Sequence, residues 1–234
     1  MPTSITWLGH AGVEIVTPVG KRILIDPWLS GNPKAPLGVD ELKGCDILLL
    51  THAHGDHAAD APAISKRFQP QTVAIYDFVR ILEKQGLTNL VGISLGGTVN
   101  LDGIRVTGTV AFHGSTTEGP NGEVLYAGNP MGFVVAIPDG PTFYHSGDTS
   151  LFGDMKLIGE LHKPQYAFLP IGDFYTMGPE AAAMAAKLLG VKKAIPIHWG
   201  TFPVLSGTPD EFRGYLAGSG IEVMQLEPGV TVSV

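Results

Sequence analysis

Thr51-His52-Ala53-His54-Gly55-Asp56-His57 is the stretch from which the rest of this sequence is best interpreted. Three of the eight histidines fall here, together with an acid. The apolar run 47–50 precedes them and predicts a buried strand, so we expect the histidines on the loop at that strand's end. Imidazole and carboxylate are common ligands of Zn, Mn and Fe. The stretch therefore predicts a metal site, and a polar turn that is histidine-rich by chance is the weaker interpretation.

Length and composition favour an α/β protein with many short strands. The 234 residues could form one large domain or two modest ones. The chain is 44% hydrophobic and 16% charged, and its 31 glycines and 18 prolines favour shaped loops over a helical bundle. The net charge of −7 opposes a broad nucleic-acid surface. It does not exclude a phosphate ester, because bound metal ions could supply positive charge locally.

The sequence carries no sign of secretion or of a membrane segment. Cys45 is the only cysteine, so no intrachain disulfide can form, and we expect it to be a small buried residue. Residues 1–7 lack the basic start of a signal peptide, and no apolar run approaches membrane-spanning length. We therefore expect a cytoplasmic protein without a membrane partner. A homo-oligomer is compatible with the sequence.

Short strands and helices alternate along the whole chain. Strand patterns lie at 5–8, 13–16, 21–25, 72–75, 98–101, 104–110, 132–137, 142–144, 166–169, 194–197, 223–226 and 230–234. Helices are expected from Asp60 to about 69, over 77–85, 151–161 and 179–189, and after the capping box 208–211. No linker separates the halves. We therefore predict one domain, residues 1–234, in which two sheets lie face to face with helices outside.

Three further residues stand at strand ends and suit a metal site. His113 follows the apolar residues 110–112, and His198 follows the strand pattern 194–197. Asp148 leaves another strand through the small-residue turn 145–147. A lone histidine at a strand end is usually an ordinary polar residue. Three such positions beside the histidine cluster favour ligands instead.

These residues together resemble the signature of the metallo-β-lactamase superfamily, His-x-His-x-Asp-His followed by a distant His, Asp and His. The resemblance extends from Trp7 to Gly229. It implies a four-layer αβ/βα sandwich, with two mixed sheets face to face. More narrowly, the chain resembles small cytoplasmic metal-dependent hydrolases related to the ascorbate-6-phosphate lactonases. The stretches that carry this closer likeness are 8–11, 25–27, 128–130, 145–149 and 176–180.

The resemblance also implies a ligand set. One metal would be held by His52, His54 and His113, a second would be held by Asp56, His57 and His198, and Asp148 would bridge them. Because no ligand is missing, we expect two divalent ions per chain. Zinc is the first expectation, and Mn, Fe or Ni would also suit a His/Asp site.

Such a centre is suited to hydrolysis of a small ester, lactone or phosphoester by a hydroxide shared between two ions. Asp56 could orient the nucleophile or briefly accept its proton. His145 could be the leaving-group acid or a hydrogen-bond donor to the site, and His10 could donate to the substrate or be structural. Asp26 could fix the tautomer of a ligand histidine or cap the turn before Pro27.

The loops 114–131, 172–178 and 199–207 are expected to shape specificity. Their large side chains would line an apolar pocket or pack against the core; they are Tyr126, Phe174, Tyr175, Met177, Trp199 and Phe202. Few lysines or arginines lie there, which disfavours a phosphate clamp. We expect a small-molecule substrate and no nucleic acid.

Two other functions remain open. A nuclease or phosphodiesterase acting on RNA or cyclic nucleotides is disfavoured by the acidic charge. A non-catalytic metal-binding protein is disfavoured by the complete ligand set, because a purely structural ion usually has a closed site.

Overall fold

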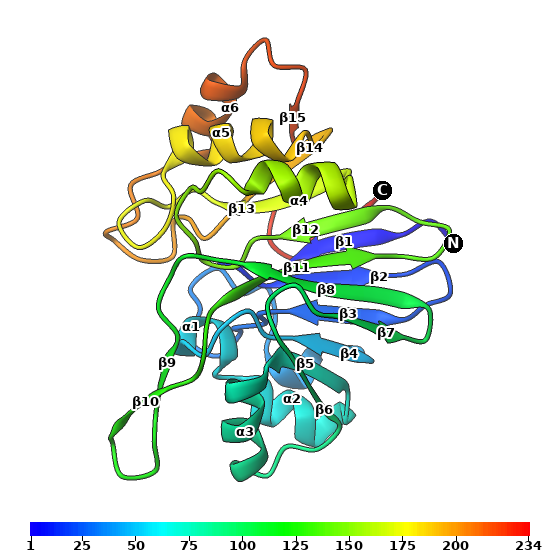
Figure 1. Cartoon of the computed structure of the whole chain (residues 1–234), viewed down its shortest axis with the longest axis vertical. Helices are drawn as coiled ribbons and strands as arrows, with labels where there is room; N and C mark the ends of the chain where they lie inside the picture. The colour runs from blue at the N-terminus through cyan, green and yellow to red at the C-terminus, as the bar shows by residue number, and fades with distance from the viewer.

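The computed structural model describes residues 1–234 and contains two seven-stranded mixed sheets that lie face to face, with helices on both outer sides (Figure 1). The first sheet has the order β16-β1-β2-β3-β4-β5-β6, and the second has the order β15-β14-β13-β12-β11-β8-β7. This arrangement confirms the predicted α/β sandwich.

The first sheet begins with antiparallel strands and continues with parallel ones. Its strands are β1 (Ser4–Trp7), β2 (Val13–Val16), β3 (Arg22–Ile25), β4 (Ile47–Leu49), β5 (Gln71–Ile75), β6 (Leu90–Ile93) and, from the end of the chain, β16 (Thr231–Ser233). The helical segments of this half are the 3-10 turn η1 (Val39–Glu41) and the helices α1 (Gly55–Ala58), α2 (Ala61–Phe68) and α3 (Tyr76–Lys84).

The second sheet repeats this plan, with antiparallel strands followed by parallel ones. Its strands are β7 (Thr98–Leu101), β8 (Ile104–Val110), β11 (Met131–Ala136), β12 (Thr142–His145), β13 (Tyr166–Pro170), β14 (Lys193–Ile197) and β15 (Glu222–Val223). The helices α4 (Met155–His162), α5 (Pro179–Leu189) and α6 (Pro209–Leu216) cover it (Figure 1). The hairpin of β9 (Thr116–Glu118) and β10 (Val124–Tyr126) projects from the body.

Two hydrophobic cores hold these layers together. The larger lies between the sheets and beneath α2 and α3, where Trp7, Phe133 and Phe168 are buried. The smaller lies under α4, α5 and α6, where Tyr144 and Phe212 pack against the alanine-rich side of α5. Central strands such as β4 are buried on both faces, which explains their unbroken apolar runs. None of the helices has both the length and the apolar character needed to cross a membrane.

Three features depart from the predicted elements. The histidine cluster is not entirely a loop, because Gly55–Ala58 forms the short helix α1 with His54 at its N-cap. Strand β6 lies between the predicted helix 77–85 and the predicted strand 98–101, where no element was predicted, and the β9–β10 hairpin falls in the segment 114–131, which was expected to be a loop. Each of these elements has only three or four residues, too few for a hydrophobic period to show in the sequence.

The packing of α4 against α5 depends on a glycine. A Cβ at Gly159 would lie 2.3 Å from the carbonyl oxygen of Leu189, at the end of α5. We expect Gly159→Ala to lower the free energy of unfolding by about 1–3 kcal/mol, because overpacking forces the helices apart. Gly214→Ala is the matched control, since nothing lies within 4 Å of that Cβ in the exposed part of α6. It should raise stability by up to about 1 kcal/mol in urea titrations.

Candidate metal centre and active site

The predicted site residues meet at one edge of the two sheets. His52 and His54 follow β4, His113 follows β8, Asp148 follows β12 and His198 follows β14. Parallel strands present their carboxyl ends at a common edge, which is where ligands bind in α/β proteins. Residues more than 140 positions apart in the sequence are thereby brought together.

The first histidine group comprises His52, His54 and His113. Their ligand atoms all lie within 4.8 Å of one another. Nε2 of His52 is 3.0 Å from Nδ1 of His54, and the ring of His113 lies 5.1 and 5.0 Å from those two rings. These three side chains are the ones that the resemblance assigns to the first ion.

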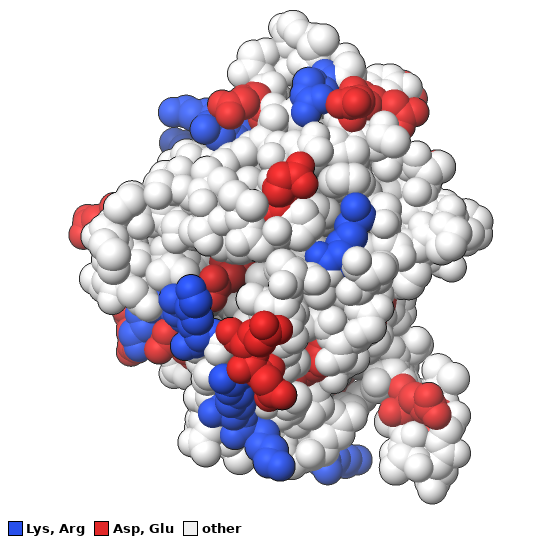
Figure 2. All heavy atoms as spheres, turned by 180° about the vertical axis from the view of Figure 1, so that it is seen from behind, with Lys and Arg blue, Asp and Glu red and all other residues white.

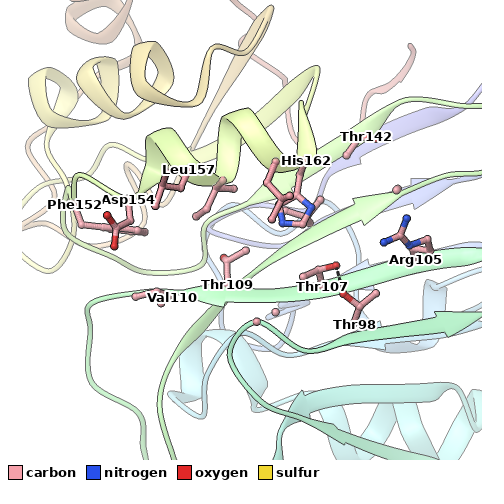
Figure 3. Close-up of a pocket in the computed structure, with 16 residues that line it drawn as sticks. Thr98, Arg105, Thr107, Thr109, Val110, Thr142, Phe152, Asp154, Leu157 and His162 are labelled. Atoms are coloured by element: carbon pink, nitrogen blue, oxygen red, sulfur yellow. Dashed lines mark hydrogen bonds between the residues drawn. The ribbon is translucent and has the colours of Figure 1, made fainter.

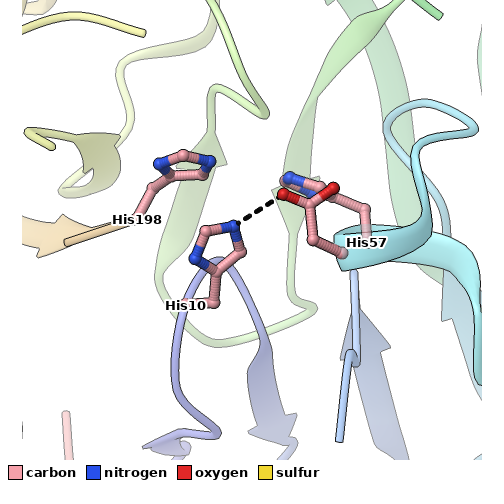
Figure 4. A group of neighbouring side chains, drawn as sticks. His10, His57 and His198 are labelled. Carbon is pink, nitrogen blue, oxygen red and sulfur yellow. Dashed lines mark hydrogen bonds and ion pairs between the residues drawn. The ribbon is translucent and has the colours of Figure 1, made fainter. Parts of the chain in front are cut away.

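The second group comprises Asp56, His57 and His198, with His10 as an additional neighbour within the same 4.8 Å. Figure 4 shows His10 at the turn after β1, His57 on α1 and His198 after β14, all directed toward one another. The rings of His10 and His198 are 3.9 Å apart. Helix α1 therefore carries Asp56 and His57 of the second group, directly after His52 and His54 of the first.

Asp148 lies between the two groups. Its Oδ2 atom is 3.1 Å from Nε2 of His198, 3.3 Å from Nε2 of His57 and 3.6 Å from Nε2 of His113. Its side chain is only 3% exposed. One carboxylate oxygen thus faces histidines of both groups, which is the geometry required of a bridging ligand.

Several atoms at this centre are buried without a hydrogen-bond partner: Oδ1 of Asp148, Nε2 of His57 and Nδ1 of His198. Buried polar atoms are normally paired, so a bound species is expected here. Burial alone would raise the pKa of Asp148, but His198 and His57 hold it well below its usual range. Burial likewise opposes a charged His57, yet Asp148 and Asp26 hold its pKa well above the usual range. The centre therefore attracts positive charge, and the donor set fits divalent metal ions.

Asp26 and Thr51 fix which nitrogen of two histidines faces the centre. Oδ2 of Asp26 accepts hydrogen bonds from Nδ1 of His57 at 2.9 Å and from the Thr51 hydroxyl at 2.5 Å, and Oδ1 accepts one from the Thr51 backbone N–H at 2.8 Å. The Thr51 oxygen in turn accepts from Nδ1 of His52 at 3.0 Å. Nδ1 of both histidines is thereby engaged and Nε2 is turned toward the centre, where a metal ion would displace any proton. Both oxygens of Asp26 accept hydrogen bonds, and the carboxylate also lies within 4.8 Å of ligand atoms of His52 and His57.

His10 makes a contact that differs from the expected donation to a substrate. Its Nδ1 lies 2.6 Å from the hydroxyl of Thr201, and its Nε2 lies 3.2 Å from Oδ2 of Asp56. Burial lowers the pKa of His10 to about 4, so the ring is neutral near pH 7. With Thr201 donating to Nδ1, the proton on Nε2 is donated to Asp56. His10 thus positions Asp56.

Asp56 is held as a carboxylate. Burial raises its pKa, but the hydrogen bond from His10 and the charge of His57 outweigh burial and hold the pKa below its usual range. A carboxylate of low pKa is a good metal ligand and a weak base. Asp56 is therefore better suited to ligation and orientation than to accepting a proton.

His145 does not reach the centre. The side chain is fully buried; its Nε2 donates to the carbonyl of Ala11 at 2.9 Å, and its Nδ1 accepts from the Gly147 N–H at 3.1 Å. Both ring nitrogens are therefore occupied by backbone groups. This contact corrects the expected role of His145 as leaving-group acid, because no nitrogen is free to protonate a leaving group.

Three of these residues adopt backbone angles that are uncommon outside glycine. His10, Asp26 and His198 have φ of 52°, 46° and 54°. Such angles cost about 1–3 kcal/mol each and cluster at functional sites, where the surrounding structure holds them in place. The positive φ of each residue produces the sharp turn by which the chain leaves the preceding strand.

A pocket of about 570 Å³ opens onto the centre, and its floor includes His54, Asp56, His113, Asp148 and His198. Its remaining lining is Trp28, Gly55, Ala59, Tyr175 and Phe202. Tyr175 and Phe202 confirm that two of the three predicted loops reach the pocket. The other large side chains of those loops do not line it; for example, Met177 is buried and Trp199 stacks on Trp7 at 5.4 Å.

Three residues that matter here had no predicted role: Trp28, Thr51 and Thr201. Trp28 follows Asp26-Pro27 at the end of β3. This place at a strand end was the one feature of the sequence that could have indicated a role in the site. Thr51 borders the histidines, but a threonine there is equally consistent with an ordinary turn. Thr201 acts through His10, which is 191 positions away in the sequence.

A second groove, of about 620 Å³, lies between α4 and the strands β7 and β8 (Figure 3). It is lined by Thr98, Arg105, Thr107, Leu157 and His162, among others. It shares no residue with the histidine pocket, and none of its residues belongs to a potential metal-binding group. The histidine pocket is therefore the candidate active site.

Comparisons with known proteins agree with this geometry. Residues 21–199 match the model of the beta-lactamase superfamily domain. A UPF0173 metal-dependent hydrolase of Rubrobacter xylanophilus is 45% identical over 97% of this chain and 95% of its own length. One of Archaeoglobus fulgidus is 44% identical over 96% of both chains. Igni18, a metallo hydrolase from Ignicoccus hospitalis, is 33% identical, has a TM-score of 0.90 and covers 100% of this chain and 99% of its own.

These similarities define the class as metal-dependent hydrolases with a metallo-β-lactamase fold. The chain belongs to the beta-lactamase superfamily and, within it, to the UPF0173 metal-dependent hydrolases.

Proposed function

We propose that this metal-dependent hydrolase cleaves a small ester, lactone or phosphoester with two divalent metal ions. His52, His54 and His113 would hold one ion, Asp56, His57 and His198 would hold the other, and Asp148 would bridge them. The observation that carries this proposal is the position of Asp148, whose Oδ2 lies 3.1–3.6 Å from Nε2 of three histidines drawn from both groups.

When bound, two such ions polarise the substrate's carbonyl or phosphoryl oxygen and activate a water molecule near neutral pH. The residues of the chain supply the rest. Asp26 and Thr51 engage Nδ1 of His57 and His52 and turn Nε2 of each ring toward the centre, and His10 keeps Asp56 in place. The aromatic residues Trp28 and Phe202 shield one side of the pocket from water.

The charge distribution favours a small substrate over RNA. On the face in Figure 2, lysines and arginines are interspersed with acids and form no continuous basic surface. The projecting β9–β10 hairpin carries Glu118 and Glu123 and no basic residue. Nucleic-acid binding depends on clustered basic residues that neutralise phosphates. A purely structural metal role is disfavoured by the pocket, since it leaves the centre open to a ligand.

We further propose that residues 1–234 act as one domain, that zinc is the resident metal, and that the protein works in the cytoplasm. His/Asp donor sets suit zinc, although Mn, Fe and Ni bind similar sites. The lone cysteine, Cys45, is buried, and burial raises its pKa to about 12, so a reactive thiol would not compete for metal.

Metal analysis combined with a substrate screen tests the proposal. Zinc-loaded protein should contain two ions per chain by plasma emission spectrometry and should hydrolyse at least one ester, lactone or phosphoester. Asp56→Ala should retain fewer ions and lose activity by about 10²–10³-fold, since one ligand is lost from an ion that contributes several kcal/mol.

Glu160→Ala is the control for loss of an acid, because Glu160 is exposed on α4, belongs to no potential metal-binding group and does not line the histidine pocket. Fully loaded wild-type protein that holds fewer than two ions per chain would contradict the dinuclear centre. Two bound ions without hydrolysis of any substrate class would favour a non-catalytic protein.

A further inference from the structure

We infer that the pocket selects an uncharged ester or lactone with an apolar acyl group, and that it disfavours substrates with an anionic acyl group. This inference rests on the proposed hydrolytic function and narrows its substrate class. Two features of the pocket carry it: an apolar wall, and the absence of lysine and arginine from the lining.

The apolar wall is formed by two packed rings. Trp28 and Phe202 are stacked with centroids 5.6 Å apart and planes inclined by 22°. The indole Nε1 of Trp28 donates to the carbonyl of Ser30 at 2.8 Å, so its only polar atom is already engaged. Both rings also meet His10 edge-on, at 5.2 and 5.4 Å. The wall is therefore anchored by the same residue that positions Asp56.

The remaining sides offer little to a charged group. Ala59 and Gly55 provide no polar side-chain atom, and apart from Trp28 and the histidines of the floor, the hydroxyl of Tyr175 is the one neutral polar group in the lining. The lining contains no lysine or arginine. The nearby Lys34 places its Nζ over the ring of Trp199 at 4.5 Å and is not part of the pocket.

The charge at the floor is compatible with an uncharged ester. Asp56 and Asp148 are both carboxylates, and they would neutralise half the charge of two divalent cations. The charge that remains can stabilise the single negative charge that develops when an uncharged ester is attacked. A carboxylate at the far end of the acyl group would instead lie against the apolar wall, where the lining has no lysine or arginine to pair with it, and burying an unpaired charge is costly.

The test compares two esters that share a leaving group and differ only at the end of a four-carbon acyl chain. 4-Nitrophenyl butyrate ends in a methyl group, and mono-4-nitrophenyl succinate ends in a carboxylate. We expect zinc-loaded protein to show kcat/KM at least about tenfold higher for the butyrate, because the carboxylate must be desolvated without a partner. Equal values, or a preference for the succinate, would overturn the inference.

A charge introduced at the pocket edge should reverse the preference. Ala59 is exposed, lines the pocket and belongs to no metal-binding group. Ala59→Lys should lower the butyrate-to-succinate ratio by about tenfold, mainly through faster succinate hydrolysis. Ala59→Met is the matched control, with a side chain of similar length and no charge, and should keep the wild-type ratio. A lysine variant that behaves like the methionine variant would contradict the charge argument.

Binding to metal-free protein separates the two proposals. The corresponding 4-nitroanilides of butyric and succinic acid can be titrated by calorimetry, and we expect the uncharged anilide to bind about tenfold more tightly. If it does so while no ester or phosphoester is hydrolysed, the hydrolytic function fails and the pocket's preference stands. If esters are hydrolysed but the anionic member is preferred in both assays, the preference fails and the function stands.

Discussion

Replacing Asp148 by asparagine is expected to lower hydrolytic activity by about 10³-fold and to reduce the metal content below two ions per chain. The Oδ2 atom of this carboxylate lies 3.1 Å from Nε2 of His198 and 3.6 Å from Nε2 of His113, one histidine from each group. An amide of the same shape carries no charge, and its nitrogen is not a metal ligand. The electrostatic contribution of a metal centre is several kcal/mol, and each 1.36 kcal/mol corresponds to tenfold in rate.

The measurements are kcat/KM on the best substrate and the dissociation constants of both ions by chelator competition. Cobalt-loaded protein adds a visible spectrum that reports coordination directly. Asp154→Asn is the matched control, because Asp154 is exposed at the start of α4 and makes no capping hydrogen bond. Urea titrations of the metal-free variants would detect misfolding. An Asp148→Asn protein that keeps two tightly bound ions and wild-type activity would show that Asp148 does not bridge.

The ligand positions could be predicted from the sequence because they are local features. His113 and His198 each follow the end of an apolar strand, and strands that run in the same direction end at a common edge. The resemblance then assigned the histidines to two groups. The structure places His52, His54 and His113 together, and Asp56, His57 and His198 together. That each group holds one metal ion stays a prediction.

The contacts behind the ligands could not be predicted in the same way. His10 stands at the end of a predicted strand and His145 stands close to Asp148 in the sequence, and a catalytic role was one of the expectations for each. Their directions are set by distant partners: His10 contacts Thr201, and His145 contacts the carbonyl of Ala11. No local pattern encodes a partner more than 130 residues away. His10 consequently reaches a ligand carboxylate, and His145 is enclosed by backbone groups.

Some short elements could not be predicted from the sequence, for a different reason. The strands β9 and β10 have three residues each and lie among glycine and polar residues. A hydrophobic alternation cannot be recognised over so few positions. The hairpin is stabilised as a unit by its own pairing, from Thr116 with Tyr126 to Glu118 with Val124. The segment 114–131 was expected to be a loop, and the hairpin within it was not predicted.

Asp26→Asn is expected to weaken metal binding at His57 by about 10–100-fold, although the substitution adds no bulk and lies outside the ligand set. In the native protein, Oδ2 of Asp26 accepts the Nδ1 proton of His57, which leaves Nε2 free to face Asp148. An asparagine can keep its oxygen on only one side. If its NH₂ group faces His57, it donates to Nδ1 and the ring proton moves to Nε2, where it blocks the metal.

The opposite orientation of the amide is no better. The NH₂ group would then face the backbone N–H of Thr51, which donates to Oδ1 at 2.8 Å in the native protein. Two donors would oppose each other in a fully buried position, at a cost of about 1–3 kcal/mol in stability. Either orientation therefore leaves a measurable defect, in metal affinity or in the free energy of unfolding.

Chelator competition for zinc and urea titration of the metal-free protein distinguish these two defects. Nitrogen chemical shifts of His57 in the zinc-loaded protein identify which ring nitrogen carries the proton. Asp46→Asn is the matched control, because Asp46 also accepts from a backbone N–H, that of Arg22 at 2.8 Å, but faces no histidine. It should leave zinc affinity unchanged. An Asp26→Asn protein with native zinc affinity and an Nδ1-protonated His57 would mean that the tautomer is fixed by the metal itself rather than by Asp26.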